Sequence, residues 1–295
     1  MSTVRAVPVP RISKAWLYLE LTKPDVTFLV VLSTLAGFYL GSRGPLNVLL
    51  MLHAVFGTTL VAAGTSALNH YFERDSDARM RRTAQRPLPL GLLAPRYAFL
   101  FGTSLVLIGT LYLGVLTNAL AAALGLATAV SYLGAYTPLK KRTTLATLIG
   151  AFPGAVSPLI GWAAVRGNLT IEAWILYAIL FLWQFPHFHA IAWMYREDYA
   201  RAGFVMLSNY DPEGFMTARQ SLLYSGCLLI ASLTPALFFY VHAWYFFSAL
   251  VLGTAFCATA VRFLMRRDRP AARTLFLASI LYLPLLLGLL VAARR

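Results

Sequence analysis

Hydrophobic residues gather into nine long stretches along the chain, and this pattern predicts its elements. A helix needs about 20 mostly apolar residues to cross the hydrocarbon layer of a bilayer. The stretches run roughly over 26–42, 47–70, 97–116, 118–136, 145–165, 172–194, 219–240, 243–263 and 272–292. We therefore expect an all-α polytopic membrane protein, with nine transmembrane helices forming one integral-membrane domain over residues 1–295.

Composition supports this class of protein. Hydrophobic residues make up 59% of the chain and charged residues only 12%, whereas roughly a quarter of the residues of a soluble protein are charged. The net charge of +14 could suggest nucleic acid as a partner. The basic residues lie in short loops between apolar stretches, however, so we expect membrane lipid as the surroundings and no nucleic acid.

The basic residues divide unequally between the two sides of the predicted bundle. The side of the N-terminus carries 21 Lys and Arg residues, and the opposite side carries four, Arg43, Arg166, Arg294 and Arg295. Cytoplasmic loops are enriched in Lys and Arg, so residues 1–25 are predicted to be a cytoplasmic N-terminal segment. That segment lacks the apolar core of a signal peptide, and we expect a bacterial cell (inner) membrane. All acidic residues except Glu172 lie on the same side, which the positive-inside rule does not require.

The first polar cluster follows the second apolar stretch. Asn69, Glu73 and Asp77 recur every four residues, so on a helix they form one stripe about 12 Å long. Such oxygen ligands suit Mg²⁺, which also binds water and substrate phosphate, and Arg82 and Arg86 follow with guanidinium groups that match phosphate geometry. The alternative is a charged helix end that marks the membrane boundary. Asn69 argues against it, because a boundary needs no amide one turn inside the apolar region.

A second polar cluster lies at the end of the sixth stretch. Pro186 is expected to kink the helix where Gln184, His187 and His189 lie, and an acidic pair, Glu197 and Asp198, follows. A histidine near a kink is more often an interior residue with satisfied hydrogen bonds than a ligand. Two acidic clusters on one membrane face, each closing an even-numbered span, favour a shared site.

A third cluster, Tyr136-Thr137-Pro138-Leu139-Lys140-Lys141-Arg142, follows the fourth stretch. Its three adjacent cations fit a diphosphate group, although a positively charged cytoplasmic loop would look the same. Glycines and prolines in the fifth stretch would let helices approach closely or bend around a large ligand.

These segments together resemble the UbiA superfamily of intramembrane prenyltransferases, and within it the protohaem IX farnesyltransferase branch. The Asn-x3-acid-x3-Asp stripe is shared by the whole superfamily. More specific strings are Met80-x-Arg82-Thr83-x-x-Arg86-Pro87-Leu88, Tyr136-Thr137-Pro138-Leu139-Lys140, Trp183-Gln184-x-Pro186-His187-Phe188 and Asp198-Tyr199-x-x-Ala202-Gly203. Two positions depart from the pattern: Asp25 replaces the usual arginine after Lys23-Pro24, and Glu73 replaces the more frequent aspartate.

The resemblance implies a Mg²⁺-dependent enzyme that transfers the farnesyl group of farnesyl diphosphate to a vinyl group of protohaem IX, with addition of water. The catalytic and metal-binding residues would be Asn69, Glu73, Asp77 and Asp198. The diphosphate-binding residues would be Arg82, Arg86, Lys140 and Lys141. Position alone, about three turns before Asp198, predicts that His187 contacts the haem or else hydrogen-bonds a carbonyl freed by Pro186, and that His189, about 200° around the helix, points away. Terminal-oxidase assembly proteins are candidate partners.

Two alternatives stay open at this point. A UbiA-type enzyme could instead prenylate the aromatic ring of a quinone precursor. A haem or anion transporter would also use basic loops and intramembrane histidines, but it would need polar groups on both membrane faces, and one predicted face is nearly bare.

Overall fold

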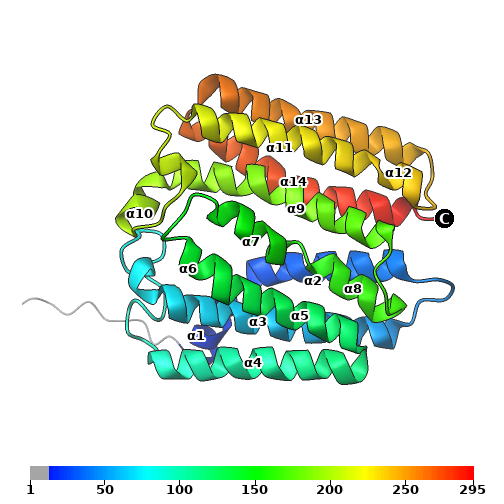
Figure 1. Ribbon diagram of the computed structural model, residues 1–295, viewed down its shortest axis with the longest axis horizontal. Coiled ribbons are helices and arrows are strands. Elements are labelled where there is room, and N and C mark those ends of the chain that lie inside the picture. Colours follow the sequence, from blue (N-terminus) through cyan, green and yellow to red (C-terminus); the bar gives the residue numbers. More distant parts are fainter. Residues whose placement is uncertain (1–12) are drawn as a thin grey trace, which may run out of the picture.

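The computed structural model describes residues 13–295, and Figure 1 shows long helices running side by side. Residues 1–12, nearly half of the predicted N-terminal segment, lie outside the described residues. Six of the helices that are long and apolar enough to cross a membrane are continuous: α2 (Pro24–Gly41), α3 (Val48–Asp77), α4 (Pro95–Leu116), α9 (Ile171–Met194), α13 (Trp244–Arg266) and α14 (Arg269–Ala293).

Three further spans are interrupted. They consist of α5 (Ala119–Ser131), η1 (Tyr132–Tyr136) and α6 (Thr137–Leu139); of α7 (Ala146–Gly154) and α8 (Ser157–Arg166); and of α11 (Phe215–Leu233) and α12 (Pro235–Phe238). Together with the continuous helices they give nine candidate spans among the described residues. The predicted all-α fold with nine spans is confirmed, with boundaries shifted by a few residues.

Local sequence signals set where several helices begin. Asn47, Asn118 and Asp268 precede α3, α5 and α14, and the side chain of each accepts a hydrogen bond from a backbone N–H of the first turn, at 3.0, 2.9 and 2.8 Å. These caps satisfy donors that have no partner within the helix. Two of these helices, α5 and α14, start within three residues of the end of the preceding helix.

The spans form a ring that α14 closes, because α14 packs on both α13 and α2. Figure 1 shows α11, α13 and α14 along one side and α3, α4 and α5 along the other. Between them, α8 contacts α2, α3, α5 and α9, and every residue from Ser157 to Ala164 is buried. The fifth span therefore fills the interior of the bundle towards one end only.

Small residues bring α2 and α8 together. A side chain at Gly161 would collide with the carbonyl oxygen of Thr34, and one at Gly37 would collide with the backbone of Pro158. Thr34 also donates a 3.2 Å hydrogen bond from its hydroxyl to the carbonyl of Ser157. Close helix approach through glycine in the fifth span, as the sequence suggested, is confirmed.

Hydrogen bonds join distant segments at the end of the bundle where the C-terminus lies (Figure 1). Val241 pairs with Arg294, and the Arg294 guanidinium donates hydrogen bonds to the carbonyls of Tyr39 and Ser42. Both carbonyls lie at the C-terminal end of α2, where backbone carbonyls run out of donors within the helix. The contact joins the last span to the first.

The loops that follow α3, α6 and α9 meet at one end of the bundle, at the left in Figure 1. A short helix, α10 (Arg196–Arg201), follows α9. Met80, Ala202, Phe204 and Met206 form a small buried cluster there, and Val205 N–H donates a 2.8 Å hydrogen bond to the carbonyl of Lys140. This packing brings the three polar clusters of the sequence to the same face.

Candidate active site

The polar stripe occupies the last turns of α3. The helix continues to Asp77, so Asn69, Glu73 and Asp77 lie on consecutive turns as predicted, and each is buried, at 1%, 6% and 1% exposure. Asp75, between them in sequence, has a side chain that is 76% exposed. Glu73 and Asp77 therefore lie on the buried face of the helix, and Asp75 lies on its exposed face.

Each residue of the stripe contacts a cation from another part of the chain. Lys23 Nζ lies 2.7 Å from Asn69 Oδ1, Lys140 Nζ lies 2.8 Å from Glu73 Oε1, and Arg86 Nη1 lies 2.7 Å from Asp77 Oδ2. Two of these cations, Arg86 and Lys140, were predicted from the sequence to bind diphosphate. Arg86 and Lys140 balance the two carboxylates, so a protonated Lys23 gives the group a net positive charge that favours an anionic ligand.

The two lysines at the site differ in electrostatics. Burial, followed by the nearby charge of Arg86, lowers the pKa of Lys23 to about 7. Burial acts on Lys140 in the same direction, but the adjacent Glu73 carboxylate outweighs it and raises the pKa of Lys140 well above its usual value. Lys140 is therefore a permanent cation, whereas the charge of Lys23 depends on which anions lie beside it.

The stripe also carries polar atoms without partners. Within residues 13–295, Asp77 Oδ1, Asn69 Nδ2 and both ring nitrogens of the neighbouring His70 are buried and have no hydrogen-bond partner. A buried carboxylate oxygen without a donor is costly, and a divalent cation would relieve that cost. Glu73 and Asp77 provide the one or two carboxylates that Mg²⁺ usually takes from a protein, so the donor set fits this metal.

Asp198 lies across the loops from the stripe, on α10. Its side chain is paired with Arg201. Among residues 13–295, no three His, Cys, Asp or Glu side chains come together as a site that could hold a metal by themselves. The structure thus brings Asn69, Glu73 and Asp77 together, and places Asp198 on a separate element of the same face.

Arg82 connects the two halves of this face. Its guanidinium lies 5.1 Å from the ring centre of Tyr195 and 6.0 Å from that of Tyr199, and it donates a 3.4 Å hydrogen bond to the Tyr199 hydroxyl. Stacking on an aromatic ring leaves the N–H groups at the edge of the guanidinium free for an anion. Lys141, the fourth predicted diphosphate ligand, is exposed.

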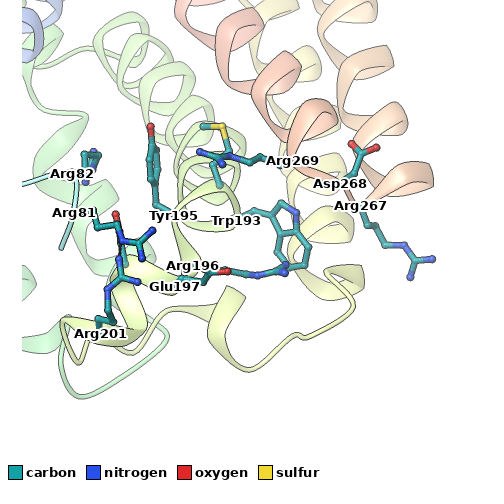
Figure 2. Close-up of a pocket in the computed structure, with 12 residues that line it drawn as sticks. Arg81, Arg82, Trp193, Tyr195, Arg196, Glu197, Arg201, Arg267, Asp268 and Arg269 are labelled. Carbon is teal, nitrogen blue, oxygen red and sulfur yellow. Dashed lines mark hydrogen bonds and ion pairs between the residues drawn. The ribbon is translucent and has the colours of Figure 1, made fainter. Parts of the chain in front are cut away.

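A cavity of about 600 Å³ opens beside Asp198 and Arg82. Its size falls within the range of about 300–1,000 Å³ that is typical of small-molecule sites. Figure 2 shows side chains from the loop after α3, the end of α9, α10 and the turn between α13 and α14 around it. The lining residues are Arg81, Arg82, Trp193, Met194, Tyr195, Arg196, Glu197, Asp198, Arg201, Arg267, Asp268 and Arg269.

The two histidines of α9 contact different helices. His187 Nδ1 lies 2.8 Å from the Ser279 hydroxyl of α14, and its ring stacks on Trp183. His189 is buried beside Tyr224 of α11, with its Nδ1 unpartnered. The helix runs without interruption from Ile171 to Met194 although Pro186 lies inside it. A role of His187 towards haem stays a prediction.

Several residues of this face were not identified from the sequence. Tyr132 and Tyr136 lie on a π-helical turn, a feature that is frequent at functional sites, and Lys140 Nζ lies 4.5 Å from the Tyr136 ring centre. The four-residue spacing of Tyr132, Tyr136 and Lys140 could have identified this group. Lys23 contacts the stripe through Asn69. Asp25, which stands where the family usually has an arginine, is exposed.

The fold and site together define a polytopic membrane protein with a buried, cation-lined carboxylate site on one face. The chain belongs to the UbiA prenyltransferase family, whose model matches residues 30–286. It is 46% identical to a protoheme IX farnesyltransferase of Solibacter usitatus over 94% of this chain and 98% of that protein. Another protein of this name, from Aquifex aeolicus, is 38% identical over 93% of this chain and 94% of its own length.

Solved structures share the fold at low sequence identity. A digeranylgeranylglyceryl phosphate synthase superposes with a TM-score of 0.78 at 18% identity, over 96% of this chain and 99% of that one. A UbiA homologue from Archaeoglobus fulgidus, bound to GPP and Mg²⁺, gives a TM-score of 0.68 at 15% identity, over 94% and 100% of the two chains. The prenyltransferase fold is thus shown.

Proposed function

We propose that this protein transfers the farnesyl group of farnesyl diphosphate to a vinyl group of protohaem IX in a Mg²⁺-dependent reaction. The allylic carbon–oxygen bond breaks and diphosphate leaves. The allylic carbon bonds to the terminal vinyl carbon, a water molecule adds its hydroxyl to the neighbouring carbon, and one proton is released. The products are haem O and diphosphate.

The observation that carries the proposal is the buried stripe of Asn69, Glu73 and Asp77 with a cation at each residue. Breaking an allylic carbon–oxygen bond requires neutralisation of the leaving diphosphate. Asn69, Glu73, Asp77 and Asp198 would hold Mg²⁺ together with the diphosphate of the substrate. The bound Mg²⁺ would withdraw negative charge from the leaving group.

Arginine and lysine residues would hold the diphosphate itself. Arg86 and Lys140 already lie within hydrogen-bonding distance of the stripe, and Arg82 lies on the Asp198 side, where its guanidinium contacts Tyr195 and Tyr199. The exposed Lys141 would act from the outside of the site. Preorganised cations need no rearrangement when charge develops on the leaving group, and such arrangements are usually the largest single contribution to catalysis.

The aromatic side chains of the site suit the allylic cation that follows. Tyr136 lies next to Lys140 and its ring centre is 4.8 Å from that of Tyr132. The faces of aromatic rings attract cations, and apolar surroundings keep water from capturing the farnesyl cation early. We assign these two tyrosines to the allylic end of the substrate.

The acceptor is assigned through the relatives, which at 38–46% identity over nearly the full length are named protoheme IX farnesyltransferase. A quinone-precursor ring is the second candidate acceptor, because the family match by itself supports prenyl transfer without naming the acceptor. Transport is disfavoured because the polar clusters share one face of the bundle.

We also assign the cellular setting. The site face would be cytoplasmic in a bacterial inner membrane, the chain would form one integral-membrane domain, and terminal-oxidase assembly proteins would receive the product. The loops of the site face carry most of the Lys and Arg residues, which supports a cytoplasmic location.

Product analysis tests the proposed function. Purified protein is incubated with farnesyl diphosphate, Mg²⁺ and haem, and the products are weighed by mass spectrometry. We expect haem to gain one farnesyl group and one hydroxyl. A parallel incubation with 4-hydroxybenzoate instead of haem should leave that ring unmodified. Prenylation of the ring with haem unchanged would support the quinone-precursor enzyme instead.

A further inference from the structure

The cavity beside Asp198 is strongly cationic, and the leaving diphosphate does not account for all of its charge. Six arginines and three acidic residues line it. Asp198 pairs with Arg201, another lining residue, and Asp268 accepts a 2.8 Å hydrogen bond from Ala271 N–H at the start of α14. Arg267 lies 3.8 Å from Glu213. Among the described residues, Arg81, Arg196 and Arg269 form no ion pair.

The wall formed by the turn between α13 and α14 is rigid. Arg267 adopts a left-handed conformation with φ of 51°, and its N–H donates a 2.8 Å hydrogen bond to the carbonyl of Phe263, which ends α13. Asp268 caps the next helix, so Arg269 occupies a fixed position at the first turn of α14. The partial positive charge of that helix end adds to the charge of Arg269.

Beside this turn, the Trp193 ring packs against Phe263 of α13 and contacts a second cation of the cavity. The Arg196 guanidinium lies 4.3 Å from the ring centre of Trp193, which directs its N–H groups to the edge of the stack. Figure 2 draws Arg82 and Arg269 on opposite sides of the Tyr195 ring. Guanidinium groups thus cover the Trp193 and Tyr195 rings, and a molecule that carries two anionic groups at one edge meets several of these groups at once.

We infer that this cavity binds the two propionate carboxylates of the haem acceptor, with Arg196 and Arg269 as their principal partners. The inference rests on the proposed function and locates its acceptor. Arg82 and Asp198 line the cavity and also belong to the diphosphate side of the site. A haem held here by its propionates therefore lies next to the farnesyl donor, and its less polar vinyl edge is free to extend away from the arginines.

The test compares haem with haem dimethyl ester, in which both carboxylates are blocked. Binding to the purified full chain is followed by the Soret band, for wild type and for the double variant Arg196→Gln/Arg269→Gln. We expect wild type to prefer haem over the ester, and the double variant to bind haem about tenfold more weakly or worse while binding the ester as wild type does. Arg266→Gln and Arg273→Gln, exposed arginines outside the cavity, are the matched controls.

Binding of pyrophosphate or of a lipid headgroup in this cavity would give different results in the same variants. Loss of Mg²⁺-pyrophosphate binding in the double variant, with haem binding unchanged, would assign the cavity to the donor and overturn the inference. Loss of thermal stabilisation by phosphatidylglycerol vesicles, again with haem binding unchanged, would assign it to a lipid headgroup and also overturn it. Equal weakening of haem and ester would show a general packing effect and would overturn it as well.

Failure of the inference can be distinguished from failure of the proposed function by turnover of wild type. If wild type farnesylates haem and the dimethyl ester equally well, the function stands and the propionate site is wrong. If wild type farnesylates neither, the acceptor itself is wrong.

Discussion

At the scale of single residues, the site consists of buried polar side chains of α3 that each contact a cation from another part of the chain. Glu73 and Asp77 are almost fully buried, and each has a cation within 2.8 Å. Removing one member of a buried pair leaves an uncompensated charge, which is strongly destabilising. Activity of a variant that removes one of these charges should therefore be measured on protein that thermal unfolding shows to be folded.

Replacing arginine by lysine tests whether the guanidinium fork matters for the donor. We expect Arg82→Lys and Arg86→Lys each to raise the apparent KM for farnesyl diphosphate about tenfold, because a point charge replaces a planar fork. Steady-state kinetics with haem held at saturation measures the effect, and Arg79→Lys, at an exposed position of the same loop, is the control. An unchanged apparent KM for farnesyl diphosphate in both variants would show that these arginines contribute only to the positive charge of the cytoplasmic face.

The two histidines of α9 provide a matched pair for haem binding. His187 has its Nδ1 fixed by the Ser279 hydroxyl, which leaves Nε2 as the nitrogen that could meet a macrocycle or its iron. We expect His187→Ala to shift the Soret band or weaken haem binding, and His189→Ala to do neither. If wild type and His187→Ala give the same spectra and affinities, His187 only joins α9 to α14.

The sequence predicts the stripe correctly because the spacing of Asn69, Glu73 and Asp77 is a local helical property. It does not predict their partners, since Lys23 and Lys140 lie 46 and 67 residues away from the groups that they contact. The separation of Asp198 from the stripe also follows from tertiary packing alone. Spacing within one helix can be read from a sequence, whereas contacts between helices cannot.

At the scale of elements, glycine at the contact of α2 and α8 determines how closely the interior span packs. We expect Gly161→Ala to destabilise the protein by about 1–3 kcal/mol, because the added methyl group collides with the backbone of α2. Gly226→Ala is the control, since a Cβ there meets open space and alanine favours helix over glycine. Thermal unfolding in detergent at one scan rate compares them.

A lower midpoint for Gly161→Ala alone would confirm that the α2–α8 contact is fully packed. Equal midpoints for the two variants would show that α8 can shift to accommodate the methyl group.

Hydrophobic pattern predicts the existence of the spans but not their interruptions. The fifth span divides into α7 and α8 between Gly154 and Ser157, and the fourth ends in a π-helical turn. Apolar residues continue through both regions, so hydropathy has no signal there. Glycine and proline at 153–158 indicated the first interruption, whereas the π-helical turn at Tyr132–Tyr136 carries no comparable mark.

At the scale of the whole molecule, the site face should be cytoplasmic. In a Cys227→Ser/Cys257→Ser background, we expect Arg43→Cys to react with a membrane-impermeant maleimide in intact cells, and Gln85→Cys to react only after the membrane is opened. Both positions are exposed, and they lie in loops at opposite ends of α3. The reverse labelling pattern would place the site on the outer face and contradict the charge distribution.

The central claim is that farnesyl diphosphate reacts with haem at the buried stripe of α3. The most direct measurement is the amount of farnesylated, hydroxylated haem formed by wild type, Asp77→Asn and Asp75→Asn, with Mg²⁺ and after its removal by EDTA. Asp77 is buried at the stripe and Asp75 is exposed beside it. We predict Mg²⁺-dependent product from wild type and Asp75→Asn, and a loss of about a hundredfold or more in Asp77→Asn. Equal product from the two variants, or full product in EDTA, would contradict the account.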